Sequence, residues 1–371
     1  MIQDTAHTNL IEPVSGIKKS EQLKKHLLKE IEQMLKDKVN TLDTELNLMQ
    51  RFGVSRQTVR KVLKELREEG YIVTHQGSGT FLTGKSPLES RNVVEILLAT
   101  PEEYIFPELL ASIRQKLVVL GFKVSLTDNM GDFFTERKIL ENFLEKPPRA
   151  IISECFSAFQ NPNLDLYHKL QSNGTSLLFL YGIYPNFPAW SVVKDDNYRG
   201  AYQLVQKLKG HGHRSLAGIF ISDTIQGQER LSGYLDALRD LSMDFSGSHI
   251  LMLHKSDLKD LLNPALQLRL QSFTQDVLYE ASALVCFNDE IAYRLLPILT
   301  RFHINVPEDL SIVSFDDSFL SLIEKIHITS LAHTKHSFTD AVTASITRLL
   351  SDTASDTVVV PWTLTEGNSV I

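Results

Sequence analysis

Two arginines four residues apart carry the clearest chemical signal of the sequence. Arg56 and Arg60 lie in the segment 52–60, which reads FGVSRQTVR. Residues spaced by four project from one side of a helix, and a guanidinium fork can donate two hydrogen bonds to a guanine edge or bind a phosphate. The spacing therefore predicts a helix that enters the major groove of double-stranded DNA. The alternative is a basic helix face that only contacts solvent, and the elements around the arginines argue against it.

A second set of polar side chains follows apolar segments that are typical of buried strands. Arg230 lies in QERLSGY, Asn288 and Asp289 follow LVCF, and Asp316 and Asp317 follow IVSF. Open α/β sheets bind ligands at the carboxyl ends of their strands, and an arginine fork with a carboxylate and an amide can bracket the vicinal hydroxyls of a sugar. Each residue alone is better explained as a helix cap, but their shared location predicts a site for a small polar ligand.

Three other patterns do not support a function. Residues 79–86 match the phosphate-binding pattern GxxxxGKS, but the middle of the match reads as a strand and no crossover helix follows, which excludes nucleotide hydrolysis. His211 and His213 have no third metal ligand nearby, so we expect no metal site. Cys155 and Cys286 lie in apolar surroundings and are interpreted as core residues. No nucleophile is paired with a base, so we predict no catalytic residue and no enzyme.

The elements around the two arginines predict a winged helix-turn-helix. Apolar residues at spacings of three and four predict a helix over residues 18–37. Thr44 opens a second helix that Gly53 stops, and Ser55 caps a third helix that carries both arginines. Residues 71–83 contain two β segments around a polar turn, which is typical of a hairpin. Three helices followed by a hairpin form an α+β DNA-binding head of about 70 residues.

The remainder of the chain alternates apolar runs with helical periods. Continuous runs of this kind indicate strands that are buried on both faces. They lie at residues 93–99, 123–127, 150–153, 176–181, 215–221, 283–287 and 311–315. Repeated βαβ units build a doubly wound parallel sheet. Because some 280 residues exceed one core, we expect two such lobes with a cleft between them.

The distribution of charge also separates the head from the body. The formal net charge is −7, but residues 18–85 contain 14 Lys and Arg against 9 Asp and Glu, a balance of +5, which leaves −12 for the rest. A small basic module attached to a large acidic one indicates two functions in one chain. The predicted organisation is a tail at 1–17, the head at 18–84, a linker at 85–92 and the body at 93–371.

The first residues of the chain and its apolar runs indicate where in the cell the protein is located. Residues 1–16 lack the basic and apolar regions of a signal peptide, and no apolar run reaches the length of a membrane helix. We therefore expect a cytoplasmic protein that does not associate with a membrane.

The head resembles the GntR family of bacterial regulators. The family layout FGVSRxTVR followed by LxxEGYIxxxQGSGTF is present between residues 52 and 81. The resemblance implies DNA contacts from the start of the first helix, the turn before the second, the recognition helix and the wing. The residues at these positions are Lys19, Glu45, Ser55, Arg56, Gln57, Thr58, Arg60, Gln76, Gly77 and Ser78. Two positions depart from the family, which usually has proline at Asp43 and a polar residue at Leu46.

The body resembles the effector domain of LacI regulators and the type I periplasmic binding proteins. The similar segments are DDNYRGAYQLVQKLKGHGHRSLAGIF, QERLSGYLDAL, LVCFNDEIAY and VPEDLSIVSFDDS. The resemblance implies an α/β bilobal fold with two doubly wound parallel sheets and a small ligand, usually a sugar or purine, in the cleft between the lobes. The residues implied to bind this effector are Tyr104, Glu154, Arg230, Asn288, Asp316 and His333.

A GntR head on a LacI-like body is an uncommon pairing, and it is similar to a family of L-arabinose-responsive repressors. This resemblance implies a transcriptional repressor whose affinity for operator DNA is controlled by a small sugar. L-Arabinose is the first candidate for this effector, and no cofactor is expected. We expect a homodimer, because two heads on a pseudo-palindromic operator double the contacts of one.

Alternatives remain for the ligand and for the class of protein. A repressor of the same build could sense another sugar or a nucleoside. A sugar-modifying enzyme and a transport binding protein are disfavoured, because the sequence contains neither a paired nucleophile nor a signal peptide.

Overall fold

The described part of the chain forms two units, a head and a body. The computed structural model describes residues 18–75, 78–87, 92–185, 190–243, 249–259, 263–323, 325–334, 336–351 and 355–371. The first unit contains the head and runs to Val93, with two short segments at 146–149 and 169–175, and the second unit contains the rest of the body.

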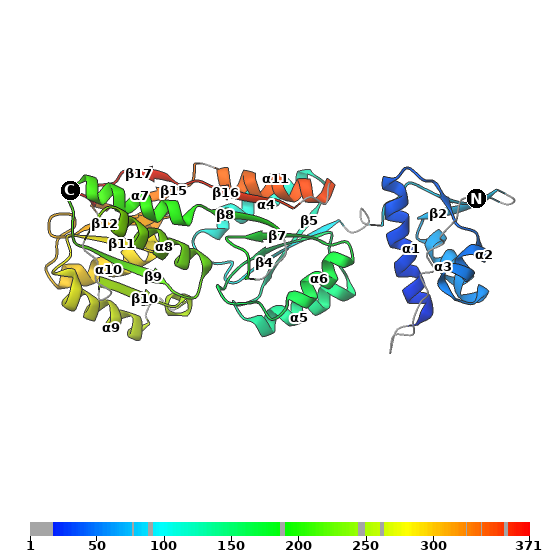
Figure 1. The fold of residues 1–371 in the computed structure, drawn as a ribbon, viewed down its shortest axis with the longest axis horizontal. Coiled ribbons are helices and arrows are strands. Elements are labelled where there is room, and N and C mark those ends of the chain that lie inside the picture. Colours follow the sequence, from blue (N-terminus) through cyan, green and yellow to red (C-terminus); the bar gives the residue numbers. More distant parts are fainter. Residues whose placement is uncertain are drawn as a thin grey trace. The chain divides into compact units, whose positions relative to one another are not determined.

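The head contains the predicted three helices and hairpin (Figure 1). Its elements are α1 (Lys19–Lys36), β1 (Thr41–Leu42), α2 (Glu45–Phe52), α3 (Arg56–Glu68), β2 (Ile72–His75) and β3 (Gly79–Leu82). The two-residue strand β1 was not predicted; it pairs antiparallel with β3 and gives a sheet of order β1-β3-β2. Leu23, Leu27 and Ile31 of α1 are buried in one core with Val59 and Val62 of α3, which fixes the recognition helix on its support.

Part of the predicted linker packs on the head. The Lys85 ammonium donates to the carbonyl of Glu69 at 2.6 Å and lies 4.8 Å from the centroid of the Tyr71 ring. Ser86 is buried and donates to Glu32 of α1 at 2.5 Å. Lys85 and Ser86, the first residues of the predicted linker, therefore contact the head.

The first lobe of the body contains a six-stranded sheet of order β16-β8-β7-β6-β4-β5. Its strands are β4 (Val93–Leu98), β5 (Lys123–Asp128), β6 (Ala150–Glu154), β7 (Ser176–Leu180), β8 (Ser191–Asp195) and β16 (Thr357–Val360). Its helices are α4 (Phe106–Val119), α5 (Phe133–Glu145), α6 (Leu164–Ser172) and α11 (Ser337–Ser351). The pairs β4–β6, β6–β7, β7–β8 and β8–β16 are parallel.

The second lobe contains a six-stranded sheet of order β10-β9-β11-β12-β15-β17. Its strands are β9 (Leu216–Ile221), β10 (Ile250–Leu253), β11 (Ala283–Cys286), β12 (Ser311–Phe315), β15 (Thr329–Ala332) and β17 (Thr363–Thr365). Its α-helices are α7 (Asn197–Gly210), α8 (Ile225–Asp240), α9 (Pro264–Phe273) and α10 (Asp289–Arg301). A 3₁₀ helix (Lys255–Leu258), a π-helical turn (Thr274–Leu278), a 3₁₀ turn (Phe319–Ser321) and the strand pair β13 (Leu322–Ile323) and β14 (Ile326–His327) complete it.

The predicted fold class is confirmed with one refinement. Separate apolar clusters cover the two faces of the second sheet, as a doubly wound sheet requires. The last strand β17 runs antiparallel to β15, so this sheet is mostly, not wholly, parallel. Cys155 and Cys286 are buried free thiols, as predicted. Among the described residues, no helix has the length and apolar character needed to cross a membrane.

The chain passes between the two lobes of the body three times. It enters the second lobe between β8 and α7, returns between β15 and α11, and crosses again between β16 and β17. Asp195 is the last residue of β8, directly before the first crossing, and His333 and Trp362 lie on the second and third crossings. The crossings adjoin the strand ends where the sequence predicts the effector site.

Helices α7 and α8 pack so closely that replacing Gly233 with alanine should lower the stability of the body. A Cβ added at Gly233 of α8 would lie 2.0 Å from the carbonyl oxygen of Tyr198 in α7, and backbone cannot give way as a flexible side chain can. We expect Gly233→Ala to destabilise the body by about 2–3 kcal/mol, measured by urea unfolding.

The matched control is Gly210→Ala at the end of α7. An added Cβ there meets nothing within 4 Å, so stability should stay unchanged or rise slightly. Equal midpoints for Gly233→Ala and the native protein would contradict the packing argument.

Candidate functional site

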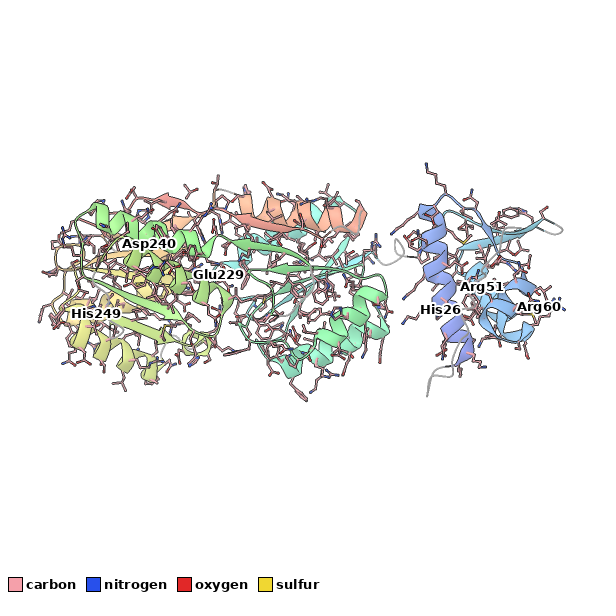
Figure 2. All side chains as sticks on the ribbon, viewed as in Figure 1. His26, Arg51, Arg60, Glu229, Asp240 and His249 are labelled. Carbon is pink, nitrogen blue, oxygen red and sulfur yellow. The ribbon has the colours of Figure 1, made fainter. Side chains whose placement is uncertain are left out.

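The head presents the two predicted arginines on an exposed helix. Thr44 caps α2 through the amide of Asn47, and Gly53 ends it with a left-handed φ of 64°. Ser55 then caps α3 by accepting from the amide of Thr58 at 3.2 Å. This turn directs the side chains of Arg56 and Arg60 to solvent, with exposed fractions of 65% and 59%. Figure 2 shows Arg60 on the side of the head away from α1.

Glu45 joins the two arginines to each other. Its carboxylate accepts from Nε of Arg60 at 3.0 Å and from Nε of Arg56 at 3.3 Å. Although partial burial acts to raise it, the pKa of Glu45 is lowered by these two guanidinium groups. The contacts use Nε, and each guanidinium has two further nitrogens that can donate hydrogen bonds to a ligand. Glu45 is predicted to contact DNA, and in the structure its carboxylate pairs with both arginines.

The two departures from the GntR pattern have different environments. Asp43 accepts from Arg51 of α2 at 2.5 Å, and Arg51 also pairs with Glu30 of α1, so Arg51 connects α1 to α2 and Asp43 is its second partner. Leu46 is 61% exposed in the first turn of α2. Lys19 and Gln57 are exposed, and Thr58 is half-buried. At the wing tip, Ser78 is exposed, whereas Gln76 and Gly77 lie outside the described residues.

The body brings four predicted effector residues together from both lobes. Tyr104 lies before α4 in the first lobe, whereas Arg230 on α8, Asn288 before α10 and Asp316 after β12 belong to the second. The Tyr104 hydroxyl donates to Asp316 at 2.5 Å and accepts from the amide of Asn288 at 3.0 Å. Arg230 lies 3.8 Å from the other oxygen of Asp316. Residues up to 212 positions apart thus form one polar cluster at the carboxyl ends of the strands.

Arg230 is the most constrained member of this cluster. It is 4% exposed, donates from Nε to Asn197 at 2.9 Å and from a terminal nitrogen to the carbonyl of Phe287. Its guanidinium carbon lies 3.9 Å from the centroid of the Phe315 ring. Burial lowers the pKa of Arg230, while Asp316 opposes that change. A charged fork held this firmly can donate to ligand hydroxyls without further ordering.

The pKa values of Asp316 and Tyr104, the neighbours of Arg230 in the cluster, are raised. Burial raises the pKa of Asp316, against the effect of Arg230 and Tyr104. Burial and the neighbouring Asp316 raise the pKa of the Tyr104 phenol well above its ordinary value, so Tyr104 stays a hydrogen-bond donor at neutral pH. Together they offer a guanidinium, a carboxylate, an amide and a phenol, which is the donor and acceptor set that binds a polyhydroxylated ligand.

His333 connects the three lobe crossings. Its Nε2 lies 2.8 Å from Asp195, and its ring stacks on Trp362 at 4.0 Å between centroids. Within the described residues, Nδ1 of His333 and Nε1 of Trp362 are buried without a hydrogen-bond partner. The Trp362 ring lies 5.5 Å from the Arg230 guanidinium, so the crossings adjoin the polar cluster.

Glu154 belongs to a different cluster. It is buried at the end of β6 and accepts from the amide of Ala99 at 2.9 Å. Burial raises its pKa to about 6, although Lys255 acts against this. Lys255 of the second lobe pairs with Glu103 of the first at 2.8 Å. Burial lowers the pKa of Lys255, but Glu103 and Glu154 outweigh this effect and raise it.

Several residues of these clusters were missed by sequence reasoning. Lys255 follows β10, a strand that the sequence did not predict, and Trp362 lies on a crossing that no motif marks. Asn197 stands in the segment DDNYRG, which was quoted only for its resemblance. No group of three or more His, Cys, Asp or Glu side chains that could hold a metal ion occurs among the described residues, and His211 and His213 form no such group.

Comparison with known proteins defines the class. Residues 20–82 match the bacterial regulatory proteins of the gntR family, and residues 205–370 match the periplasmic binding protein-like domain. A transcriptional regulator CelR–cellobiose complex has a similar fold, with a TM-score of 0.64 and 19% identity over 85% of this chain and 91% of that one. CcpA of Lactococcus lactis has a TM-score of 0.63 and 21% identity over 76% and 99%. The chain is a winged-helix regulator with a LacI-like body.

Curated relatives define the family more narrowly. The arabinose metabolism transcriptional repressor of Halalkalibacterium halodurans is 31% identical over 301 residues, which cover 79% of each chain. That of Geobacillus stearothermophilus is 29% identical over 297 residues, covering 79% of this chain and 80% of its own. The chain belongs to this family of transcriptional repressors.

Proposed function

We propose that the chain represses genes of sugar use and that a small sugar, L-arabinose first among candidates, lowers its affinity for operator DNA. The observation that carries this proposal is the convergence of Tyr104 with Arg230, Asn288 and Asp316 across the two lobes. The relatives named for arabinose metabolism support the choice of sugar. The proposed effector residues are those four together with His333 and Glu154.

The proposed DNA contacts lie on the head. Arg56 and Arg60 would read base edges from α3, while Lys19, Ser55, Gln57 and Thr58 would position the helix on phosphates. The wing residues Gln76, Gly77 and Ser78 would follow the adjacent groove. Glu45 would act by holding the two arginines in register.

A homodimer would place two such heads on one operator. An exposed apolar strip at the end of α4 supports this part of the proposal: Val118, Val119 and Leu120 are 53%, 82% and 49% exposed. The strip borders a groove of about 760 Å³ between α4 and α11. A contiguous apolar surface of this kind is typical of a protein interface, and the proposed occupant is the same surface of a second copy.

Sugar binding would be coupled to the heads through the lobes. Hydroxyls of the sugar would replace the bonds that Tyr104, Asn288 and Asp316 make with one another, and the lobe arrangement with sugar would differ from that without it. A difference that changes the spacing of two heads would lower operator affinity by the coupling energy, about 1–3 kcal/mol. Repression would then be relieved.

The test selects bound fragments from random-sequence duplex DNA and titrates the selected operator in gel shifts. We expect an inverted repeat, as a dimer requires, and a loss of operator affinity of about 5- to 150-fold at millimolar L-arabinose. The same titration is repeated with a panel of other sugars. The panel contains D-fucose, whose ring hydroxyls have the same pattern as those of L-arabinose, and unrelated hexoses. Selection of no sequence, or an unchanged affinity with every sugar, would contradict the proposal.

The alternative effector is another sugar or a nucleoside in the same cleft. Solved structures of this fold were determined with cellobiose and with D-xylulofuranose, so the fold accepts ligands of different sizes. Calorimetry and gel shifts with the panel, extended to other pentoses, cellobiose and nucleosides, decide between them, since only the true effector should bind tightly and also release the operator.

A further inference from the structure

Asp289 is a buried carboxylate that the proposed function does not use. It is the first residue of α10, directly after Asn288, and is fully buried. Burial and the charge of Asp316 raise its pKa to about 7. A buried carboxylate is costly unless many donors surround it, so its partners indicate what it stabilises.

Four donors converge on this carboxylate from three places. Ser314 on β12 and Ser330 on β15 donate their hydroxyls, the latter at 2.9 Å. In the turn after β12, Ser318 donates both its amide, at 2.7 Å, and its hydroxyl, at 3.0 Å. Asp289 therefore joins two neighbouring strands to the turn that contains Asp316.

That turn has an unfavourable backbone. Asp316 has a φ of 95° and Asp317 a φ of 44°, and such left-handed conformations cost non-glycine residues about 1–3 kcal/mol each. They persist only where surrounding bonds determine them. Two further hydrogen bonds hold the turn, besides those from Ser318 to Asp289. The amide of Asp317 donates to the hydroxyl of Ser330 at 3.1 Å, and the amide of Asp316 donates to the carbonyl of Leu331 at 2.7 Å.

We propose that Asp289 is the positioning residue of the effector cleft: by holding Ser318 it keeps the turn in the strained conformation that places the Asp316 carboxylate against Tyr104 and Arg230. Ser318 also accepts the Leu320 amide on its hydroxyl at 3.2 Å and the Ser321 amide on its carbonyl at 2.9 Å, but both of these bonds are internal to the turn, so the loss of Asp289 removes the anchor of Ser318 on α10. This inference rests on the proposed function for its ligand, but the positioning itself is a property of the free protein.

The first test measures the turn without any sugar. In Asp289→Ala, hydrogen exchange of the peptide spanning residues 314–322 should become at least about 10-fold faster, while the central strands β9 and β11 keep their rates. The variant Asp289→Asn retains one acceptor oxygen and the side-chain volume, and should give an intermediate rate. Equal acceleration throughout the lobe, or unchanged exchange of the turn, would overturn the proposal.

The second test measures sugar affinity by calorimetry. Asp289→Ala should weaken L-arabinose binding at least about 10-fold and Asp289→Asn less. In an Asp316→Asn background, Asp289→Ala should add little, because residues that act through one another are not additive. Additive losses would mean that Asp289 does not act through Asp316 and would overturn the proposal.

The matched control is Asp309→Ala. Asp309 also accepts a backbone amide and a side-chain amide, from Asn305 at 2.8 and 2.7 Å, in a turn of the same lobe. It should lower stability without altering sugar affinity or exchange of the 314–322 peptide; a matching loss of affinity would overturn the specific role of Asp289. If the native protein binds no sugar of the panel, the proposed function fails, and the exchange experiment still decides the role of Asp289.

Discussion

Replacing Arg230 with alanine should abolish the response to sugar while leaving operator binding intact. The guanidinium is 4% exposed and connects Asn197, the Phe287 carbonyl and Asp316. Its removal leaves the buried Asp316 without a compensating charge, a change that costs about 3–5 kcal/mol. We expect the Kd for L-arabinose to rise at least ~100-fold, measured by calorimetry, and the operator complex to persist at any sugar concentration in gel shifts.

Two further variants identify the cause of this effect. Arg230→Lys keeps the charge but loses the planar fork, so it should recover only a small part of the affinity. Arg239→Ala removes an arginine from the same helix, but Arg239 is 69% exposed and pairs with Asp236 on the surface, so both functions should be unchanged. Native sugar affinity in Arg230→Ala would remove Arg230 from the site. Loss of operator binding as well would make its role structural.

The head could be predicted almost completely from the sequence because its signals are local. The cap at Ser55 and the left-handed residue Gly53 act within a few residues of the turn that they determine. The exceptions are the short strand β1, which pairs with β3, and the ion pairs of Glu45, whose contact with DNA stays a prediction. The pairs of Glu45 with Arg56 and Arg60 span 11 and 15 residues, and no spacing rule on one helix anticipates a contact between two helices.

The body was predicted at the level of its sheets but only in part at its site. All seven predicted strands are present. Six of them are mostly buried, as their continuous apolar runs indicate, but β5 is an edge strand without a buried residue, so the expectation that it is buried on both faces was wrong. The missed strands β10, β16 and β17 are short and partly exposed. Strands β8 and β15 are mostly buried, but their polar residues interrupt the apolar pattern. Since Lys255 and Trp362 follow two of these missed elements, neither could be placed near the cleft.

The sequence also could not predict which strand ends approach one another. Tyr104 and Asp316 each follow a predicted strand, but their hydrogen bond depends on how the two lobes face each other. The same holds for Asp289, which reads as a helix cap in the sequence and contacts three serines that lie 25 to 41 residues away. Such contacts arise from tertiary packing, which periodicity does not encode.

Replacing Arg60 with alanine should have the largest effect on DNA. Arg60 is 59% exposed on α3, so its loss leaves the apolar core of the head unchanged, and it removes a fork that can bind a guanine edge with two hydrogen bonds. Each such contact contributes about 1–3 kcal/mol of base discrimination, and Glu45 would then hold Arg56 alone. We expect operator affinity in gel shifts to fall to the level of unrelated DNA, with sugar binding by calorimetry unchanged.

Two variants separate base reading from simple charge. Arg60→Lys keeps the positive charge, so it should retain binding to unrelated DNA and its salt dependence while losing preference for the operator. Lys61→Ala removes the same charge from the next position of the helix, where the side chain is also exposed, and should lower operator affinity only about threefold. If Lys61→Ala and Arg60→Ala weaken operator and unrelated DNA equally, both side chains bind phosphate, and sequence reading must come from Arg56 and the wing.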